Sequence, residues 1–177
     1  MKKLVIALFS FLALSQVSAQ SQSVDYRTIP VSNKQLGEFP FFEFPISLKA
    51  MNIPYQNADD HLFIPINGKF KEFTGQVWRS FVQANGENWS LFSFNKKISS
   101  WIVSKGGVPV YKGKIARSQL DLVKEKMDYA GAEGSIDYWN NPVNVYIIKQ
   151  ADRNIFVQFS GNTASGEIQI IETKEGF

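Results

Sequence analysis

The chain has 177 residues and a formal net charge of +3, with no Cys and a single His. Disulfides are therefore excluded, and zinc sites, which draw mainly on Cys and His, have only His61 to use. Two of the positive charges lie within the first three residues, so the rest of the chain is close to neutral and carries no electrostatic footprint for nucleic acid or an anionic membrane.

Residues 1–19 have the layout of a secretory signal peptide of bacterial type. Lys2-Lys3 precedes a short apolar run from Leu4 to Leu14, and Val17-Ser18-Ala19 is a small-residue cleavage site. The apolar run is shorter than the roughly 20 residues that a membrane-spanning helix needs. We expect an exported protein that does not span a membrane after cleavage. The periplasm is the expected location, with extracellular or outer-membrane-associated placement as alternatives.

The chain after the signal peptide changes character at Leu36. Residues 20–35 are polar and aperiodic, which predicts a flexible N-terminal lead. The next segment, "LGEFPFFEFPISL", is rich in aromatic residues and is interrupted by Pro40 and Pro45. Because proline cannot donate to a strand ladder, we expect an edge strand or an extended wrap here. Residues 36–177 have a length that suits a single domain.

A strong β signal follows this segment. The sequence "HLFIPI" is followed by Asn67-Gly68, a long run from Lys69 to Ala84, Asn85-Gly86 and "NWSLFSF". Asn-Gly between apolar runs favours a hairpin, because both residues tolerate positive φ. The pattern predicts a three-stranded antiparallel meander, and Gly75 inside the long run indicates a bulge or a break.

A helix is predicted next from the spacing of Phe94, Ile98, Trp101 and Ile102, which form one apolar stripe. The pair Gly106-Gly107 stands at the C-terminal end of this helix. Phosphate-binding glycines need the opposite end, where free N–H groups and the positive end of the helix dipole meet the anion. The glycine pair is therefore predicted to end the helix and not to bind a phosphate.

A second helix is expected from Ser118 to Ala130, followed by a loop from Ala132 to Pro142. The strand–helix–strand unit from Trp89 to Tyr111 should cross over right-handedly, with its strands parallel either directly or across a neighbour. Strands segregated from helices indicate an α+β fold: a mostly antiparallel sheet of about six to eight strands, with two helices packed on one face. The chain closes with three predicted strands, Val143–Lys149, Asn154–Phe159 and Gly166–Glu172.

Three stretches, "LGEFPFF", "FSFNKKISSWIVSKGGVPVYKG" and "GEIQIIETKE", occur in this order along the chain. Together they resemble the module that precedes the peptidoglycan-binding domain in some bacterial OmpA-like envelope proteins. The resemblance extends from Leu36 to Glu175 and departs from the pattern at Glu167, where an aromatic residue is expected. It implies a location in the cell envelope and assigns no functional residue. The C-terminal peptidoglycan-binding domain is expected to be absent.

Candidate binding residues concentrate in the loop sequence "DYWNNP". Tyr138, Trp139, Asn140 and Asn141 combine flat aromatic faces with amide donors and acceptors, and rigidly held loops often carry binding sites. The alternative is that Trp139 folds back onto the core as a lid. By contrast, Asp59-Asp60-His61 indicates a solvated loop entering a strand, because neighbouring strand residues point to opposite faces and cannot easily share a ligand.

The residue types that catalysis needs are scarce. The sole His61 would have to be the base of any serine hydrolase, and no Ser lies in a nucleophile-elbow motif. We therefore expect a non-catalytic cell-envelope domain, without metal or cofactor, that binds a protein, a peptide or a cell-wall glycan. The alternative is a small secreted hydrolase with a carboxylate-based site.

Overall fold

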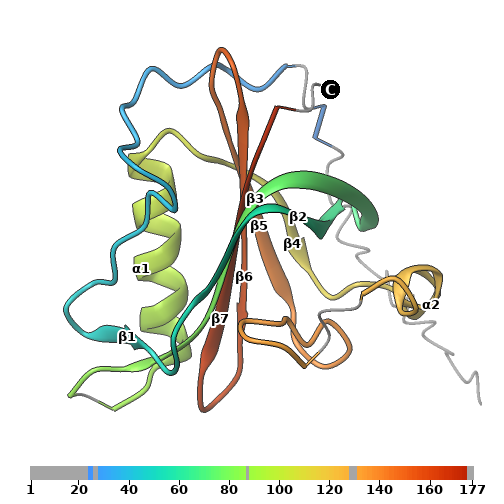
Figure 1. Ribbon diagram of the computed structural model, residues 1–177. Coiled ribbons are helices and arrows are strands. Elements are labelled where there is room, and N and C mark those ends of the chain that lie inside the picture. The colour runs from blue at the N-terminus through green and yellow to red at the C-terminus, as the bar shows by residue number, and fades with distance from the viewer. Residues whose placement is uncertain (1–23, 26–27, 87, 128–130, 175–177) are drawn as a thin grey trace, which may run out of the picture.

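The computed structural model describes residues 24–25, 28–86, 88–127 and 131–174, so the predicted signal peptide lies outside the described part of the chain. Within these residues one antiparallel sheet of seven strands is accompanied by two helices, which confirms the expected α+β class (Figure 1). The elements are β1 (Leu48–Ala50), β2 (Tyr55–Ile66), β3 (Lys69–Ala84), α1 (Leu91–Ser104), β4 (Val108–Gly113), α2 (Arg117–Val123), β5 (Val143–Lys149), β6 (Asn154–Gly161) and β7 (Gly166–Thr173).

The strands lie in the order β1-β3-β7-β6-β5-β4, and β2 also pairs with β3. All pairings are antiparallel, so β3 and β4 run in the same direction although β7, β6 and β5 lie between them. The helix α1 connects these two strands. The expected parallel crossover is therefore present, but it begins with β3 rather than at Trp89, and its strands lie further apart than predicted.

The two Asn-Gly pairs have different roles. Asn67 and Gly68, with φ of 49° and 75°, join β2 to β3 in the predicted hairpin. Asn85 instead follows the end of β3, and its N–H donates to Ser47 O at 2.8 Å. The prediction that "NWSLFSF" forms the third strand of the meander is wrong. The Ser90 hydroxyl caps a helix there by accepting a backbone N–H of the first turn at 3.2 Å.

The long strand β3 is irregular at Gly75, as its sequence indicated. The register of β2 against β3 shifts between Asn57 and Asp60, next to this glycine. A Cβ atom at Gly75 would lie 2.0 Å from the backbone oxygen of Glu172 on β7. The absence of a side chain therefore allows β3 and β7 to approach each other closely at this point.

The helix α1 confirms the predicted stripe. Phe94, Ile98 and Ile102 are fully buried, and Trp101 packs against the same core while remaining partly exposed. Gly106 has a φ of 84°, and the N–H of Gly107 donates to Ile102 O at 2.9 Å. This bond and the left-handed backbone of Gly106 end the helix, as the sequence predicted.

The two faces of the sheet carry separate apolar cores. On one face, α1 packs against strand residues such as Val157 and Phe159. On the other face, Leu120 and Val123 of α2 join a core that the β2–β3 hairpin encloses, with Phe156 among its strand residues. The prediction that both helices pack on one face is therefore wrong, and Figure 1 shows them on opposite sides of the sheet. Since successive strand residues point to opposite faces and β6 is buried throughout, both faces need a cover.

The remaining segments follow the prediction in part. The last three strands and the loop before them are confirmed to within two residues. The helix α2 ends at Val123, so the predicted continuation is wrong for residues 124–127, and residues 128–130 lie outside the described part. In the predicted N-terminal lead, Ile29 is buried and the N–H of Ser32 donates to Lys149 O at 2.7 Å, while its flexibility stays a prediction.

Candidate functional site

The structure separates the members of the predicted binding loop. Tyr138 is 3% exposed, and its hydroxyl lies 2.9 Å from Gln158 Oε1 and 3.3 Å from Phe63 O. Trp139, directly after it, is 46% exposed, and the Arg117 guanidinium lies 5.6 Å from the centre of its ring. Only one of the two aromatic rings therefore faces solvent, and the alternative in which Trp139 closes over the core is not what the structure contains.

Both asparagines of this loop are hydrogen-bonded to Asp137, Asn140 through its side chain and Asn141 through its backbone. The side-chain amide of Asn140 donates to Asp137 Oδ2 at 2.7 Å, and the N–H of Asn141 donates to Asp137 O at 3.0 Å. The N–H of Trp139 also donates to Asp137 Oδ1, at 3.2 Å. These bonds bring the predicted residues together as a local turn, which leaves the Asn140 amide occupied.

A buried polar network fastens this loop to the sheet. Gln158 Nε2 donates to Gln169 Oε1 at 2.7 Å, and Gln169 Nε2 donates to Gly134 O at 2.8 Å. At the other end of the loop, the Ser160 hydroxyl donates to Pro142 O at 2.9 Å. Removing the partner of a buried polar group destabilises the folded protein, so this network holds the loop firmly in place.

A buried carboxylate that the candidate residues did not include lies on β7. Glu167 is 5% exposed, and its Oε2 has no hydrogen-bond partner among the described residues. Burial, and to a smaller degree the negative charge of Asp137, raises the pKa of Glu167 to about 7. The sequence did mark Glu167, because it stands where an aromatic residue was expected and is a charged residue within a predicted apolar strand.

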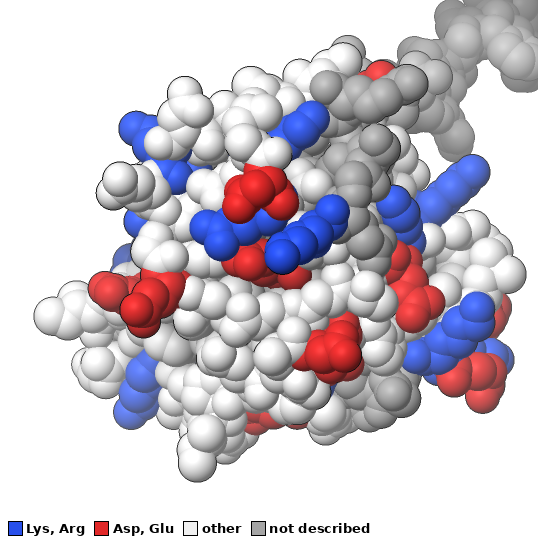
Figure 2. Space-filling model, turned by 45° about the horizontal axis from the view of Figure 1, so that its top comes forward, with Lys and Arg blue, Asp and Glu red and all other residues white. Residues whose placement is uncertain are grey.

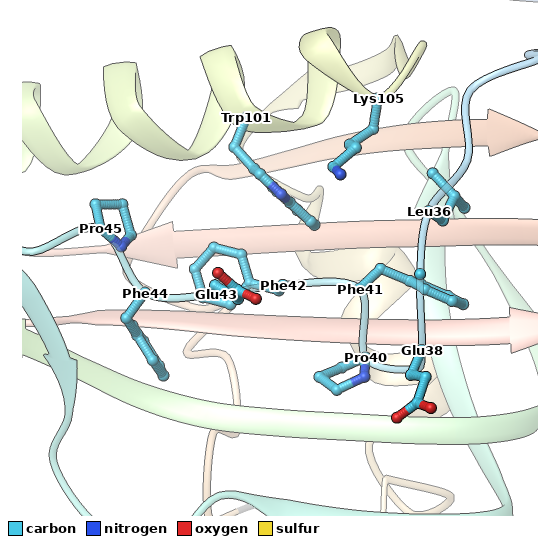
Figure 3. Close-up of a pocket in the computed structure, with 11 residues that line it drawn as sticks. Leu36, Glu38, Pro40, Phe41, Phe42, Glu43, Phe44, Pro45, Trp101 and Lys105 are labelled. Carbon is cyan, nitrogen blue, oxygen red and sulfur yellow. The ribbon is translucent and has the colours of Figure 1, made fainter.

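A separate hollow lies between α1 and residues 36–46, which we call the wrap. The wrap forms no strand, so of the two expected forms the extended wrap is the one observed. Most of its residues, together with Trp101 and Lys105 at the end of α1, line a pocket of about 620 Å³. Figure 3 shows the wrap running alongside the helix, with Pro45 near one end of the pocket and Leu36 near the other.

The floor of this pocket is aromatic and its rim is charged. Phe42 is buried, and its ring centre lies 4.8 Å from that of Trp101 and 5.0 Å from that of Phe44, both edge-on. Glu43, on the wrap, is exposed, and Lys105 extends from the helix end toward the pocket (Figure 3). The pocket therefore combines an apolar floor with groups of both charges, which suits a ligand with apolar and charged parts.

A second hollow, of about 550 Å³, continues along the helix toward its N-terminal end. It shares Pro45 with the first hollow and is otherwise lined by residues of α1, among them Phe92, Lys96 and Lys97. Phe92 is 78% exposed, and Ile46, directly after the shared proline, is 93% exposed. We call the two hollows together the α1 groove.

The other described surface regions are less suited to binding a ligand than the α1 groove. Asp60 and His61 lie within β2, and contrary to expectation their side chains meet, with Asp60 Oδ1 3.3 Å from His61 Nδ1 beside the irregularity of the strand. Within the described ranges, no three His, Asp or Glu side chains gather into a metal-binding group. On the face that Figure 2 presents, basic and acidic side chains are interspersed without a broad area of one sign.

Sequence reasoning missed the α1 groove because its walls are distant in the chain. Leu36 and Lys105 approach the same pocket, although one precedes β1 and the other follows α1. The signal that was available is the density of Phe and Pro in residues 36–45, which the sequence interpretation used for the backbone alone.

No helix among the described residues is both long and apolar enough to cross a membrane. The resemblance to the module of OmpA-like envelope proteins stays a prediction, since comparisons of the chain with protein-family models, with curated proteins and with solved structures found no match.

Proposed function

We propose that this protein is an exported binding module of the bacterial cell envelope that holds an extended peptide segment of a partner protein in the α1 groove. The observation that supports this most directly is the aromatic pocket of about 620 Å³ between the wrap and α1. Concave apolar sites with a few polar groups at the rim are the usual form of a ligand site.

The backbone of the wrap favours a peptide as the ligand. Among the described residues, the backbone of residues 36–45 takes part in two hydrogen bonds, both within local turns: Phe41 N–H to Glu38 O at 2.7 Å and Leu48 N–H to Pro45 O at 2.8 Å. At the end of the wrap, Ile46 O accepts a bond from Asn85 Nδ2 at 3.0 Å. Most N–H and C=O groups along this wall therefore have no backbone partner among the described residues, and we propose that an incoming chain bonds to those that face the groove. An extended peptide uses such groups for affinity and uses pockets for specificity.

The dimensions and the chemistry of the groove agree with this ligand. The helix α1 has 14 residues, which correspond to about 21 Å, or about six residues of extended peptide. A glycan binds best to an open aromatic face on which a sugar ring can stack. Phe42 on the floor of the first hollow is instead buried and meets its neighbouring rings edge-on.

A second candidate function rests on the Glu167–Asp137 carboxylates. A carboxyl group with a pKa near neutrality beside an exposed acid is typical of general acid–base catalysis, so this pair is the most suitable site for a hydrolase. Glu167 is buried, so a substrate would have to open the structure around it to reach its carboxyl group. Hydrolysis of a glycoside or an ester by the purified protein that disappears in Glu167→Gln would favour this candidate over peptide binding.

The experiment that tests peptide binding selects ligands without assuming a sequence. A random library of peptides about seven residues long, enough to span the groove, is displayed and selected on the purified protein. Selected peptides are then measured by fluorescence anisotropy against the wild type, Phe44→Ala, Trp101→Ala and the loop variant Trp139→Ala. We expect both groove variants to weaken binding at least about tenfold, because each removes part of the floor or its edge.

Circular dichroism melts of each variant establish that it is folded at the assay temperature. Trp139→Ala is the control, since it removes an exposed indole that lies outside the groove. Peptides that lose affinity for Trp139→Ala and keep it for Trp101→Ala would place the site on the loop. A selection that yields no specific peptide would overturn the proposed function.

A further inference from the structure

The two hollows of the α1 groove differ in charge. The first is bordered by the carboxylates of Glu38 and Glu43 on the wrap and by Lys105 on the helix side. The second contains Lys96 and Lys97 and has no carboxylate in its lining. The sequence of α1, "LFSFNKKISSWIVS", carries no acidic residue along its whole length. The N-terminal half of the groove is therefore basic, whereas the other half is mixed.

From this asymmetry we infer that the peptide bound in the α1 groove is acidic where it meets the N-terminal half of α1, and that an apolar side chain next to its acidic residues enters the hollow between Pro45 and Phe92. This inference rests on the proposed function and adds the chemical class of the partner segment and its register.

The charges of the second hollow support the acidic part of the inference. Within the described part of the chain, neither Lys96 nor Lys97 has a carboxylate at ion-pair distance, and Lys97 Nζ donates a hydrogen bond to the Ser47 hydroxyl. Carboxylates of a partner would supply the missing countercharge. The N-terminal end of α1 carries partial positive charge and has no acidic residue in its first turn, so it favours the same sign.

The exposed apolar residues support the anchoring part. Phe92, at 78% exposure, lines this hollow together with Pro45, and Ile46, which follows Pro45 in the chain, is 93% exposed. Covering large apolar side chains is favourable in proportion to the area removed from water. A flat surface such as a bilayer would touch the tips of Phe92 and Ile46 but would not fill a hollow of about 550 Å³. A peptide side chain fits this shape better.

The test compares three synthetic peptides of the same length, measured by fluorescence anisotropy at low and high salt. The first alternates Glu with Leu or Phe, the second replaces each Glu by Gln, and the third replaces each Glu by Lys. We expect the acidic peptide to bind at least about tenfold more tightly than the amide peptide, with an advantage that shrinks at high salt because exposed charges are screened. The basic peptide should bind least.

Two variants of the groove are measured with matched controls outside it. Lys96→Glu should weaken the acidic peptide at least about tenfold and improve the basic one, and its control is Lys114→Glu, at an exposed loop lysine. Phe92→Ser should weaken all three peptides, and its control is Leu122→Ser, at an exposed apolar residue of α2. Neither control should change the affinities by more than about twofold.

The outcomes separate the inference from the proposed function. If the three peptides bound equally well to the wild type and lost affinity for Trp101→Ala, peptide binding would stand. The inference that the peptide is acidic at the N-terminal half of α1 would be overturned. Absence of binding by every synthetic and selected peptide would overturn both. Binding to phosphatidylglycerol vesicles but not to peptides, abolished by Lys96→Glu and Phe92→Ser, would make this surface a membrane contact and would also overturn the inference.

Discussion

The wrap over α1 and the loop 131–142 are both irregular, aromatic-rich segments laid over one sheet, yet they are held in different ways. The loop is tied down by buried polar bonds from Tyr138, Gln169 and Ser160. The wrap rests on ring contacts such as Phe42 with Trp101, and most of its backbone has no partner among the residues that the structure describes. Aromatic content alone therefore does not identify a binding segment. The ring of Tyr138 is buried in fastening the loop and is not available to a ligand, whereas Trp101 remains partly exposed in the groove.

The largest expected effect concerns the helix that forms one wall of the groove. Phe94 is fully buried, with its ring 5.1 Å from that of Trp89 and 5.9 Å from that of Phe159. We expect Phe94→Ala to lower the free energy of unfolding by about 3–5 kcal/mol, because it leaves a cavity under the helix. Urea unfolding followed by circular dichroism measures this.

The matched control for that prediction lies two residues earlier on the same helix. Phe92 is 78% exposed, so Phe92→Ala should change the free energy of unfolding by less than about 0.5 kcal/mol. Equal losses in the two variants would mean that α1 does not present the stripe of Phe94, Ile98 and Ile102 to the sheet, and the groove would then have a different wall.

The second prediction tests the buried acid beside the loop. The pKa of Glu167 is raised from 4.5 to about 7, so between these values the native state binds more protons than the unfolded state. The stabilisation from the protonated form is complete below pH 4.5 and is lost as the pH rises through 7. Its full loss amounts to about 3 kcal/mol at 1.36 kcal/mol per pH unit. Glu167→Gln should remove this dependence.

Measurement of unfolding free energies in urea from pH 4.5 to 8 checks this sign. The difference between Glu167→Gln and the wild type should grow in favour of the variant up to about pH 7 and then level off. Glu72→Gln, at an exposed position of β3, should follow the wild-type curve. If the free energies of unfolding of the wild type and of Glu167→Gln changed by the same amount across this interval, the Glu167 carboxyl would not be desolvated.

Local features of the sequence predicted the elements that depend on neighbouring residues. The stripe of α1, the Asn67-Gly68 hairpin and the last three strands depend on residues close together in the chain, and local periodicity and turn preference determine them. The segment "NWSLFSF" was misassigned because its apolar residues fit both an alternating strand and the first turn of a helix. The cap at Ser90 decided between the two.

The candidate site was harder to predict because long-range pairing decides which side chains remain available. Tyr138 points inward because β6 brings Gln158 beneath the loop, and no local pattern around the tyrosine contains that information. The groove likewise depends on contact between Trp101 and Phe42, although β1, β2 and β3 lie between them in the sequence. The faces of the two helices could not be assigned for the same reason, since both faces of β5 to β7 are apolar.

The third prediction separates the anchoring residue of the loop from its neighbours. Tyr138→Phe removes the hydroxyl that contacts Gln158 Oε1 and leaves this buried amide oxygen short of a donor. We expect a loss of about 1–3 kcal/mol in the free energy of unfolding. Tyr146→Phe is the control, because its hydroxyl bonds the Ser99 hydroxyl at 3.1 Å at a half-buried position, where water can replace it. A smaller loss for Tyr138 than for Tyr146 would contradict the role of the network.

The smallest effect is expected at Trp139, the residue that the sequence singled out together with Tyr138. Its ring is 46% exposed and its main described side-chain contact is the Arg117 guanidinium at 5.6 Å, so Trp139→Ala should lower the free energy of unfolding by less than about 1 kcal/mol. Thermal melts measure that change. Peptides selected on the wild type should bind this variant unchanged in fluorescence anisotropy. If their affinity fell while the fold was intact, the ring at position 139 would be part of the binding surface. Fastening of the loop through Tyr138 would then serve to present its neighbour to a ligand, and the contrast between the two segments would no longer hold.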